Sequence, residues 1–166
     1  MSTVLGIDLG TQSVKIVFYD FDSRKTVAVE SAPLDLYQTE AGVAEQQAHW
    51  WIHAFRQALQ KVGNDIRNSI VAIGVSGQQH GFVPIDDTGE VLAPVKLWCD
   101  TSTGAECDAI TDAFGGVDAC IAEVGNPVLP GYTASKVRWF RDAKPGRYAQ
   151  MDSILLPHDY LNFYLT

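Results

Sequence analysis

Hydrophobic and polar residues alternate along three short runs at the start of the chain. These runs, STVLGIDLG, SVKIVFYDF and KTVAVESAP, are rich in β-branched residues and are separated by short turns. Alternation with a period of two indicates strands that bury one face. The pattern therefore predicts a three-stranded meander.

A change of period marks the next element. In QAHWWIHAFRQALQKVGNDI, apolar residues recur every three or four positions, which is typical of an amphipathic helix. They are Trp51, Phe55, Ala58, Leu59 and Val62. We expect this helix to end near Gly63 and Asn64. The following run, IVAIGVSG, is almost continuously apolar, which predicts a strand covered on both faces and added in parallel to the meander.

The second half of the chain predicts shorter elements. GFVPIDDTGEVLAPVKLW suggests two short strands around an Asp-Asp-Thr-Gly turn. DTSTGAECDAITDAF is expected to form a helix with Asp100 or Thr101 as its N-cap and Gly115 beyond its end. Thr133 is expected to cap a further helix, ASKVRWFRDA, which ends before Pro145. DSILLPHDYLNFYLT predicts a buried strand, a proline break and a last helix.

This order of elements predicts an α/β fold. Strands come first, and helices then alternate with further strands, so we expect a mixed five-stranded sheet with helices on its faces. The 166 residues are 46% hydrophobic and 19% charged. A chain of this size and composition can bury a substantial core, and we expect one domain over residues 1–166.

The sequence also argues against several classes of function. Twelve basic and twenty acidic residues give a net charge of -8, and no basic stripe is present to bind nucleic acid. No apolar run is long enough to span a membrane, and Asp8 interrupts the N-terminal run that a signal peptide would need. Cys99, Cys107 and Cys120 lack metal-ligand spacing and fit free thiols, so we expect a cytoplasmic protein.

The turn between the first two predicted strands carries candidate chemistry. In GIDLGTQSVK, Asp8 ends a buried strand and is followed by Gly10, Thr11 and Ser13. Backbone N–H groups and hydroxyls can hold phosphate oxygens, and a carboxylate can bind the magnesium ion that accompanies a nucleotide. Lys15 would add a positive charge. Ordinary hairpins have the same residues, so a purely structural turn stays open as an alternative.

Five stretches in series resemble one family. GIDLGTQSVK resembles the first phosphate loop of the actin-like ATPase superfamily. GVSGQQHG, LWCDTST, GNPVLPGYTASKVRWF and LLPHDYLNFYLT resemble successive motifs of the FGGY carbohydrate kinases, above all of members that phosphorylate D-xylulose. The resemblance implies a ribonuclease H-like domain of the actin-like ATPase superfamily. It also implies the N-terminal portion of a kinase that makes D-xylulose 5-phosphate, without the C-terminal ATP-binding domain.

The resemblance assigns cofactors and site residues. It implies ATP and magnesium as cofactors, with Asp8 as the magnesium-associated carboxylate. The phosphates would lie near Gly10, Thr11, Gln12, Ser13 and Lys15. The sugar would be bound by Gln79, His80, Trp98 and Asp100. Imidazole, carboxylate and indole groups suit sugar hydroxyls and the apolar face of a sugar, although His80 as an ordinary loop histidine and Trp98 as a core aromatic remain alternatives.

Two departures from the family pattern concern the substrate and the reaction. Gln79 replaces a methionine that is common in bacterial relatives, which leaves the exact ketose open. Ser102 stands where many relatives have arginine, which argues against a kinase for glycerol more than against a kinase for xylulose. Ribulose, fuculose and gluconate stay open as substrates, because kinases for them share the phosphate loop. The family's proton-accepting aspartate lies in a Gly-rich segment that nothing in this chain matches. Asp152 and Asp159 fit structural roles better.

Two classes of function therefore remain. The first is the sugar-binding and phosphate-loop portion of a kinase, inactive without the rest. The second is a non-catalytic domain of actin-like fold that binds a sugar or another partner. The expected partner is a small-molecule sugar, with no nucleic acid and no membrane. Apolar surface exposed on an incomplete protein would also favour self-association, for example as a homodimer.

Overall fold

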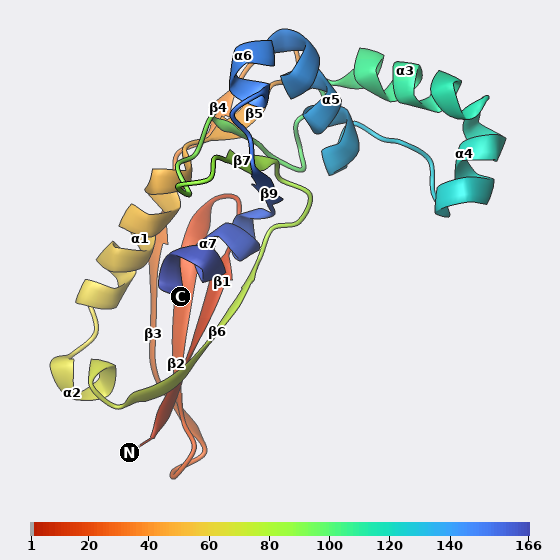
Figure 1. Cartoon of the computed structure of the whole chain (residues 1–166). Coiled ribbons are helices and arrows are strands. Elements are labelled where there is room, and N and C mark those ends of the chain that lie inside the picture. Colours follow the sequence, from red (N-terminus) through yellow and green to blue (C-terminus); the bar gives the residue numbers. More distant parts are fainter. Residues whose placement is uncertain (1) are drawn as a thin grey trace. The chain divides into compact units, whose positions relative to one another are not determined.

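The computed structural model describes residues 2–166, which form two compact units (Figure 1). Unit 1 comprises the stretch up to Leu36 together with Gln47–Gln79 and Pro157–Thr166. Unit 2 comprises Tyr37–Gln46 and His80–Leu156. No helix within residues 2–166 is long and apolar enough to cross a membrane.

Unit 1 is built on a four-stranded mixed sheet. Its strands are β1 (Thr3–Leu9), β2 (Ser13–Asp20), β3 (Lys25–Pro33) and β6 (Ile70–Gly77), in the order β3-β2-β1-β6. The first three strands pair antiparallel and β6 pairs parallel with β1. This confirms the predicted meander and its parallel extension. The expected five-stranded sheet is wrong, because the remaining strands belong to two small sheets of unit 2.

One face of this sheet is covered by helices. Helix α1 (Ala48–Gln60) packs on β2 and β3, and α7 (Pro157–Leu165) packs on β6 (Figure 1). The sheet buries seven apolar side chains, those of Leu5, Ile7, Leu9, Val14, Ile16, Phe18 and Ala32. Helix α1 buries Ala48, Trp51, Ala54, Phe55 and Ala58. Three residues of the predicted stripe are thus confirmed as buried in the helix, whereas Leu59 is half-buried and Val62 is buried beyond the helix end. Gly63 then separates α1 from the single turn of α2 (Asn64–Arg67).

Strand β6 differs from its prediction. The run IVAIGVSG was expected to be covered on both faces, but β6 is an edge strand of the described sheet. Val71 is 67% exposed and Ile73 is 47% exposed. The prediction is wrong for the described residues because they leave side chains on both faces of β6 exposed.

Unit 2 combines two small sheets with helices. Strands β4 (Tyr37–Gln38), β5 (Ala44–Gln46) and β8 (Val95–Lys96) form one sheet, and β7 (Val83–Ile85) pairs with β9 (Ser153–Leu155). The helices are α3 (Gly104–Phe114), α4 (Val117–Val124), α5 (Thr133–Ala143) and the short α6 (Pro145–Tyr148). A cluster of Phe82, Leu92 and Phe140 is buried among them.

Several local expectations for unit 2 can be compared with the structure. Gly115 ends α3 in a left-handed conformation, with a φ of 90°, as predicted. The predicted N-caps of α3 and α5 are wrong, because α3 begins after Thr103 and α5 after Tyr132. Helix α4 was not predicted. The Asp-Asp-Thr-Gly turn is present, since the Asp86 carboxylate accepts hydrogen bonds from the backbone N–H groups of Thr88 and Glu90. After the turn an isolated bridge joins Val91 to Ile85, and the next strand, β8, begins at Val95.

Candidate functional site

In unit 1, Asp8 has two polar neighbours on adjacent strands. Its Cα pairs in register with that of Lys15 on β2 and with that of Ser76 on β6. Leu9 and Ile7, on either side of Asp8, point into the covered core. Since side chains alternate along a strand, Asp8, Lys15 and Ser76 lie on the uncovered face. They line a shallow cavity of about 350 Å³ whose floor includes glycines of β1 and β6.

The turn after β1 is held by a residue that the sequence did not single out. Gln78 donates from its backbone N–H to the Leu9 carbonyl at 2.8 Å. Its side-chain oxygen accepts a hydrogen bond from the Thr11 hydroxyl at 3.3 Å. The Gly10 N–H donates to the Ser13 carbonyl at 3.0 Å and closes the turn. Gln78 therefore joins the turn between β1 and β2 to the end of β6.

The residues of this turn fit the phosphates and the magnesium ion of a nucleotide. The Asp8 side chain makes no hydrogen bond or ion pair with any residue of the described chain, so its carboxylate oxygens are accessible to a ligand. Residues 2–166 hold no cluster of three or more side chains that could ligate a metal ion. Magnesium commonly binds through one or two carboxylates, with phosphate oxygens and water supplying the rest. A single exposed carboxylate beside Lys15 suits such an ion.

In unit 2, His80 has an unusual backbone conformation. Its φ is 59°, in the left-handed region that non-glycine residues rarely adopt. The His80 carbonyl accepts hydrogen bonds from the Thr133 hydroxyl and from the Lys136 ammonium group, both at 3.2 Å. The imidazole lies 4.9 Å from the Tyr132 ring, measured between centroids. The side chain of His80 is exposed and its backbone is clamped, which suits a group that meets a ligand.

Lys136 is fully buried, and its ammonium group contacts three backbone carbonyls. Besides His80, it donates to the carbonyls of Gly131 at 2.8 Å and Tyr132 at 3.3 Å. Burial lowers the pKa of Lys136 to about 8, although the nearby Asp100 carboxylate acts in the opposite direction. The sequence offered no signal for this role, because Lys136 lies within an ordinary amphipathic helix.

His80 also borders a largely apolar cavity of unit 2. The cavity has a volume of about 620 Å³, and its apolar walls come mainly from α3, α4 and the segment before α5. These side chains are Ile110, Phe114, Val124, Val128 and Tyr132. The imidazole is therefore a polar group at the edge of an apolar surface, as in many small-molecule sites.

The two other predicted sugar-binding residues have different surroundings. Trp98 is 51% exposed, so the alternative that it is a core aromatic is wrong. Asp100 is fully buried and accepts hydrogen bonds from the Ala44 and Ser102 N–H groups, the Ser102 hydroxyl and Lys96. Burial raises the pKa of Asp100, but these hydrogen bonds and Lys96 hold it below its ordinary value. Both oxygens of this carboxylate are already engaged within the protein.

The structure thus gathers the predicted residues into two groups. In unit 1, Asp8, Gly10, Thr11, Gln12, Ser13 and Lys15 lie at and beside the turn between β1 and β2. In unit 2, His80 lies with Tyr132 and Lys136, and Trp98 is exposed on the segment after β8. Gln79 is exposed and is the last residue of the stretch Gln47–Gln79 of unit 1.

Comparison with known proteins defines the class. The N-terminal domain of the FGGY family of carbohydrate kinases matches residues 3–166, so the chain belongs to this family. A xylulose kinase from Haemophilus influenzae is 42% identical over 98% of the chain, and one from Bacillus subtilis is 35% identical over all of it. The xyloylose kinase structure from Brucella ovis superposes with a TM-score of 0.88 at 34% identity, over 98% of this chain and 34% of that one.

The chain spans about a third of the length of the curated relatives that it matches. It covers 34% of the Haemophilus influenzae protein and 33% of the Bacillus subtilis protein. The comparisons therefore describe an N-terminal domain of a sugar kinase family and confirm the family and the mixed α/β fold.

Proposed function

We propose that the chain is the N-terminal portion of an ATP-dependent kinase that phosphorylates D-xylulose on its carbon-5 hydroxyl. The observation that carries the proposal is the identity of 42% to a xylulose kinase, maintained over 98% of the chain. The accessible carboxylate and lysine at the turn between β1 and β2 support it, because phosphoryl transfer relies on positioning and charge neutralisation.

In this proposal the turn between β1 and β2 holds the nucleotide phosphates. Mg-ATP supplies the phosphoryl group that is transferred to the sugar. Asp8 would bind the magnesium ion, directly or through water, and Lys15 would neutralise phosphate charge beside it. Gly10, Thr11, Gln12 and Ser13 would contact the phosphates. Gln78 keeps this turn in place through its hydrogen bonds to Leu9 and Thr11.

The sugar is assigned to the residues around His80. The His80 imidazole would exchange hydrogen bonds with sugar hydroxyls, with Gln79 beside it, and Trp98 would contact an apolar face of the sugar. Asp100, whose oxygens are occupied, would act indirectly by fixing the segment that carries Trp98. Lys136 and Thr133 would act as positioning residues because they hold the His80 backbone.

None of the residues proposed for the phosphates or the sugar is assigned as the group that accepts the proton of the sugar hydroxyl. Asp152 is exposed and accepts a hydrogen bond from Ser153, and Asp159 pairs with His158. Neither lies among the residues proposed for the sugar. We therefore place the proton acceptor in the part of the kinase that this chain does not cover, which is about two thirds of its relatives.

The test is a coupled assay of ADP release by the longer protein that contains this domain. D-xylulose should give a higher kcat/KM than D-ribulose, L-fuculose or D-gluconate. A clear preference for one of those three would overturn the xylulose assignment. Absence of turnover with all four, in a folded protein that contains the rest of the kinase, would favour the non-catalytic alternative.

A further inference from the structure

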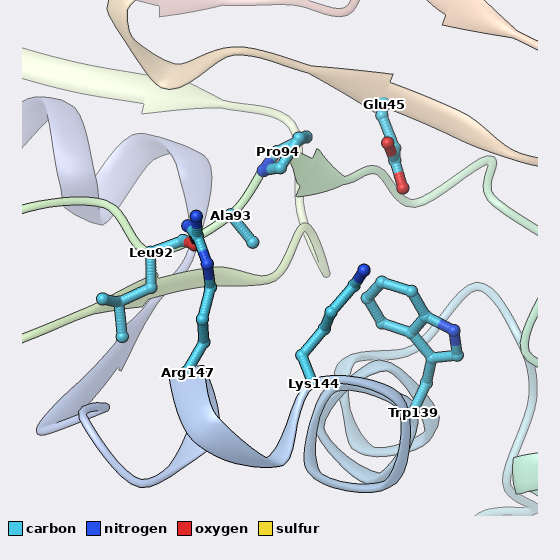
Figure 2. Close-up of a pocket in the computed structure, with 7 residues that line it drawn as sticks. All are labelled: Glu45, Leu92, Ala93, Pro94, Trp139, Lys144 and Arg147. Carbon is cyan, nitrogen blue, oxygen red and sulfur yellow. Dashed lines mark hydrogen bonds between the residues drawn. The ribbon is translucent and has the colours of Figure 1, made fainter.

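Unit 2 contains a second cavity, with a volume of about 380 Å³ and a mixed polar lining. Figure 2 shows its walls: Glu45 of β5, the segment Leu92, Ala93 and Pro94, Trp139 of α5, and Lys144 and Arg147 around the start of α6. None of the residues proposed for ATP or sugar lines it.

Two cations face this cavity without a carboxylate partner. Lys144 makes no side-chain hydrogen bond or ion pair within residues 2–166. Arg147 donates one hydrogen bond to the Leu92 carbonyl, which leaves most of its five N–H donors available. By contrast, Arg138 and Arg141 of α5 both pair with Asp142. In a chain with a net charge of -8, two neighbouring cations without acidic partners favour an anionic ligand.

Two further side chains of the lining, Glu45 and Trp139, are held in place by a buried lysine. Lys96, only 2% exposed, pairs with the Glu45 carboxylate at 3.1 Å and lies 4.4 Å from the centroid of the Trp139 ring. Lys96 also pairs with the buried Asp100, so it offsets only part of the charge of Glu45, and it orients the side chains of Glu45 and Trp139. Groups fixed before a ligand arrives lose little conformational entropy on binding, so Glu45 and Trp139 are preorganised.

The chemistry of the lining identifies a class of ligand. Lys144 and Arg147 suit a phosphate group, for which arginine offers paired donors. The Glu45 carboxylate accepts hydrogen bonds from hydroxyls, and the Trp139 indole suits the apolar face of a sugar ring. We propose that this cavity binds a phosphorylated sugar, with its phosphate on Lys144 and Arg147 and its hydroxyls on Glu45. The proposal depends on the geometry of unit 2 and not on kinase activity.

Binding can be measured with D-ribose 5-phosphate as the probe, using the chain described here. Calorimetry gives the affinity, and the indole N–H signals of the four tryptophans report the location by NMR. Trp139→Phe identifies the signal of Trp139. Ribose 5-phosphate should shift that signal and bind about tenfold more tightly than inorganic phosphate or D-ribose, because each of these offers only half of the contacts.

Charge variants then separate this cavity from other sites. Lys144→Glu should weaken binding of ribose 5-phosphate by about tenfold or more, because it reverses a charge without removing a contact of the fold. Lys25→Glu, at an exposed cation of β3 in unit 1, is the matched control and should change the affinity less than about twofold.

The proposal is overturned by three results. These are no binding at about 10 mM ribose 5-phosphate, equal affinity for inorganic phosphate, or loss of binding in His80→Ala with retention in Lys144→Glu. The last result would place the ligand at the proposed substrate site. Since none of these measurements needs turnover, failure of the kinase assignment would leave them unaffected.

Discussion

Lys136 keeps a positive charge in the interior of unit 2 because three backbone carbonyls surround its ammonium group. One of these carbonyls belongs to His80, which lies 56 residues earlier in the chain. The sequence could identify Asp8 and Lys15, whose relation depends on one short turn. It could not identify Lys136 as a partner of His80, because only the folded chain brings the two together.

The lowered pKa of Lys136 predicts a pH-dependent stability. Its pKa is about 8 in the fold, against an ordinary value of 10.5. Between these values the unfolded chain binds more protons at this residue, so the free energy of unfolding rises with pH. From pH 7.5 to 9.5 the wild type should gain roughly 2 kcal/mol relative to Lys136→Met, measured by urea denaturation.

The same prediction can be checked without a variant. NMR titration of the Lys136 ammonium group should give a midpoint near pH 8. A midpoint at the ordinary lysine value, or equal pH dependence in the wild type and Lys136→Met, would contradict a buried ammonium group at this position.

Asp8 gives a second prediction at the residue scale. Because Asp8 is exposed and has no partner within residues 2–166, Asp8→Ala should change the free energy of unfolding by less than about 0.5 kcal/mol. In a protein that contains this domain and has the proposed kinase activity, it should lower kcat by about a hundredfold or more, because it removes the proposed magnesium ligand. Asp108→Ala, at an exposed residue of α3, is the control. Ordinary turnover by Asp8→Ala would exclude the magnesium role.

At the scale of elements, the sequence predicted the long strands and helix α1 from their repeating hydrophobic pattern, but it did not predict the pairing of the shortest strands. The strands β1, β2, β3 and β6 and the helix α1 run for seven to thirteen residues each, long enough to show a period. Strands β4 and β8 have two residues each, and no alternation can be recognised over that length. Their pairing with β5 depends on tertiary contacts, which is why a single five-stranded sheet was predicted wrongly.

Alanine substitution should have different effects at two glycines of β6, because only one of them closely approaches β1. A Cβ on Gly77 would lie 2.8 Å from the Leu9 carbonyl oxygen and 2.9 Å from the Leu9 Cβ, whereas a Cβ on Gly74 would meet nothing within 4 Å. Gly77→Ala should therefore lower the free energy of unfolding by about 2 kcal/mol. Gly74→Ala should change it by less than about 0.5 kcal/mol. Chemical denaturation of both variants tests this, and similar values for the two would refute a close contact at Gly77.

At the scale of the whole molecule, the two edges of the unit 1 sheet have different character. Strand β3 carries Lys25, Glu30 and Pro33, which are residues that protect an exposed edge from pairing with other chains. Strand β6 carries no charge and exposes Val71 and Ile73. The apolar pattern of β6 predicted a covered strand, and the described residues do not provide the cover. The chain matches 34% of the Haemophilus influenzae xylulose kinase, and in a protein of that length the remaining residues would be the source of such cover.

This unprotected edge predicts that residues 1–166 alone self-associate through β6. Sedimentation velocity over a range of concentrations should show dimers or larger species, because an uncharged apolar edge strand pairs readily with another copy. Val71→Lys combined with Ile73→Lys should restore the monomer, since both side chains are largely exposed and the charges would oppose pairing. Val29→Lys, at a 54% exposed residue of β3, is the matched control and should leave association unchanged. A wild-type chain that stays monomeric throughout, or association that the β6 variant retains, would show that β6 is not the associating edge.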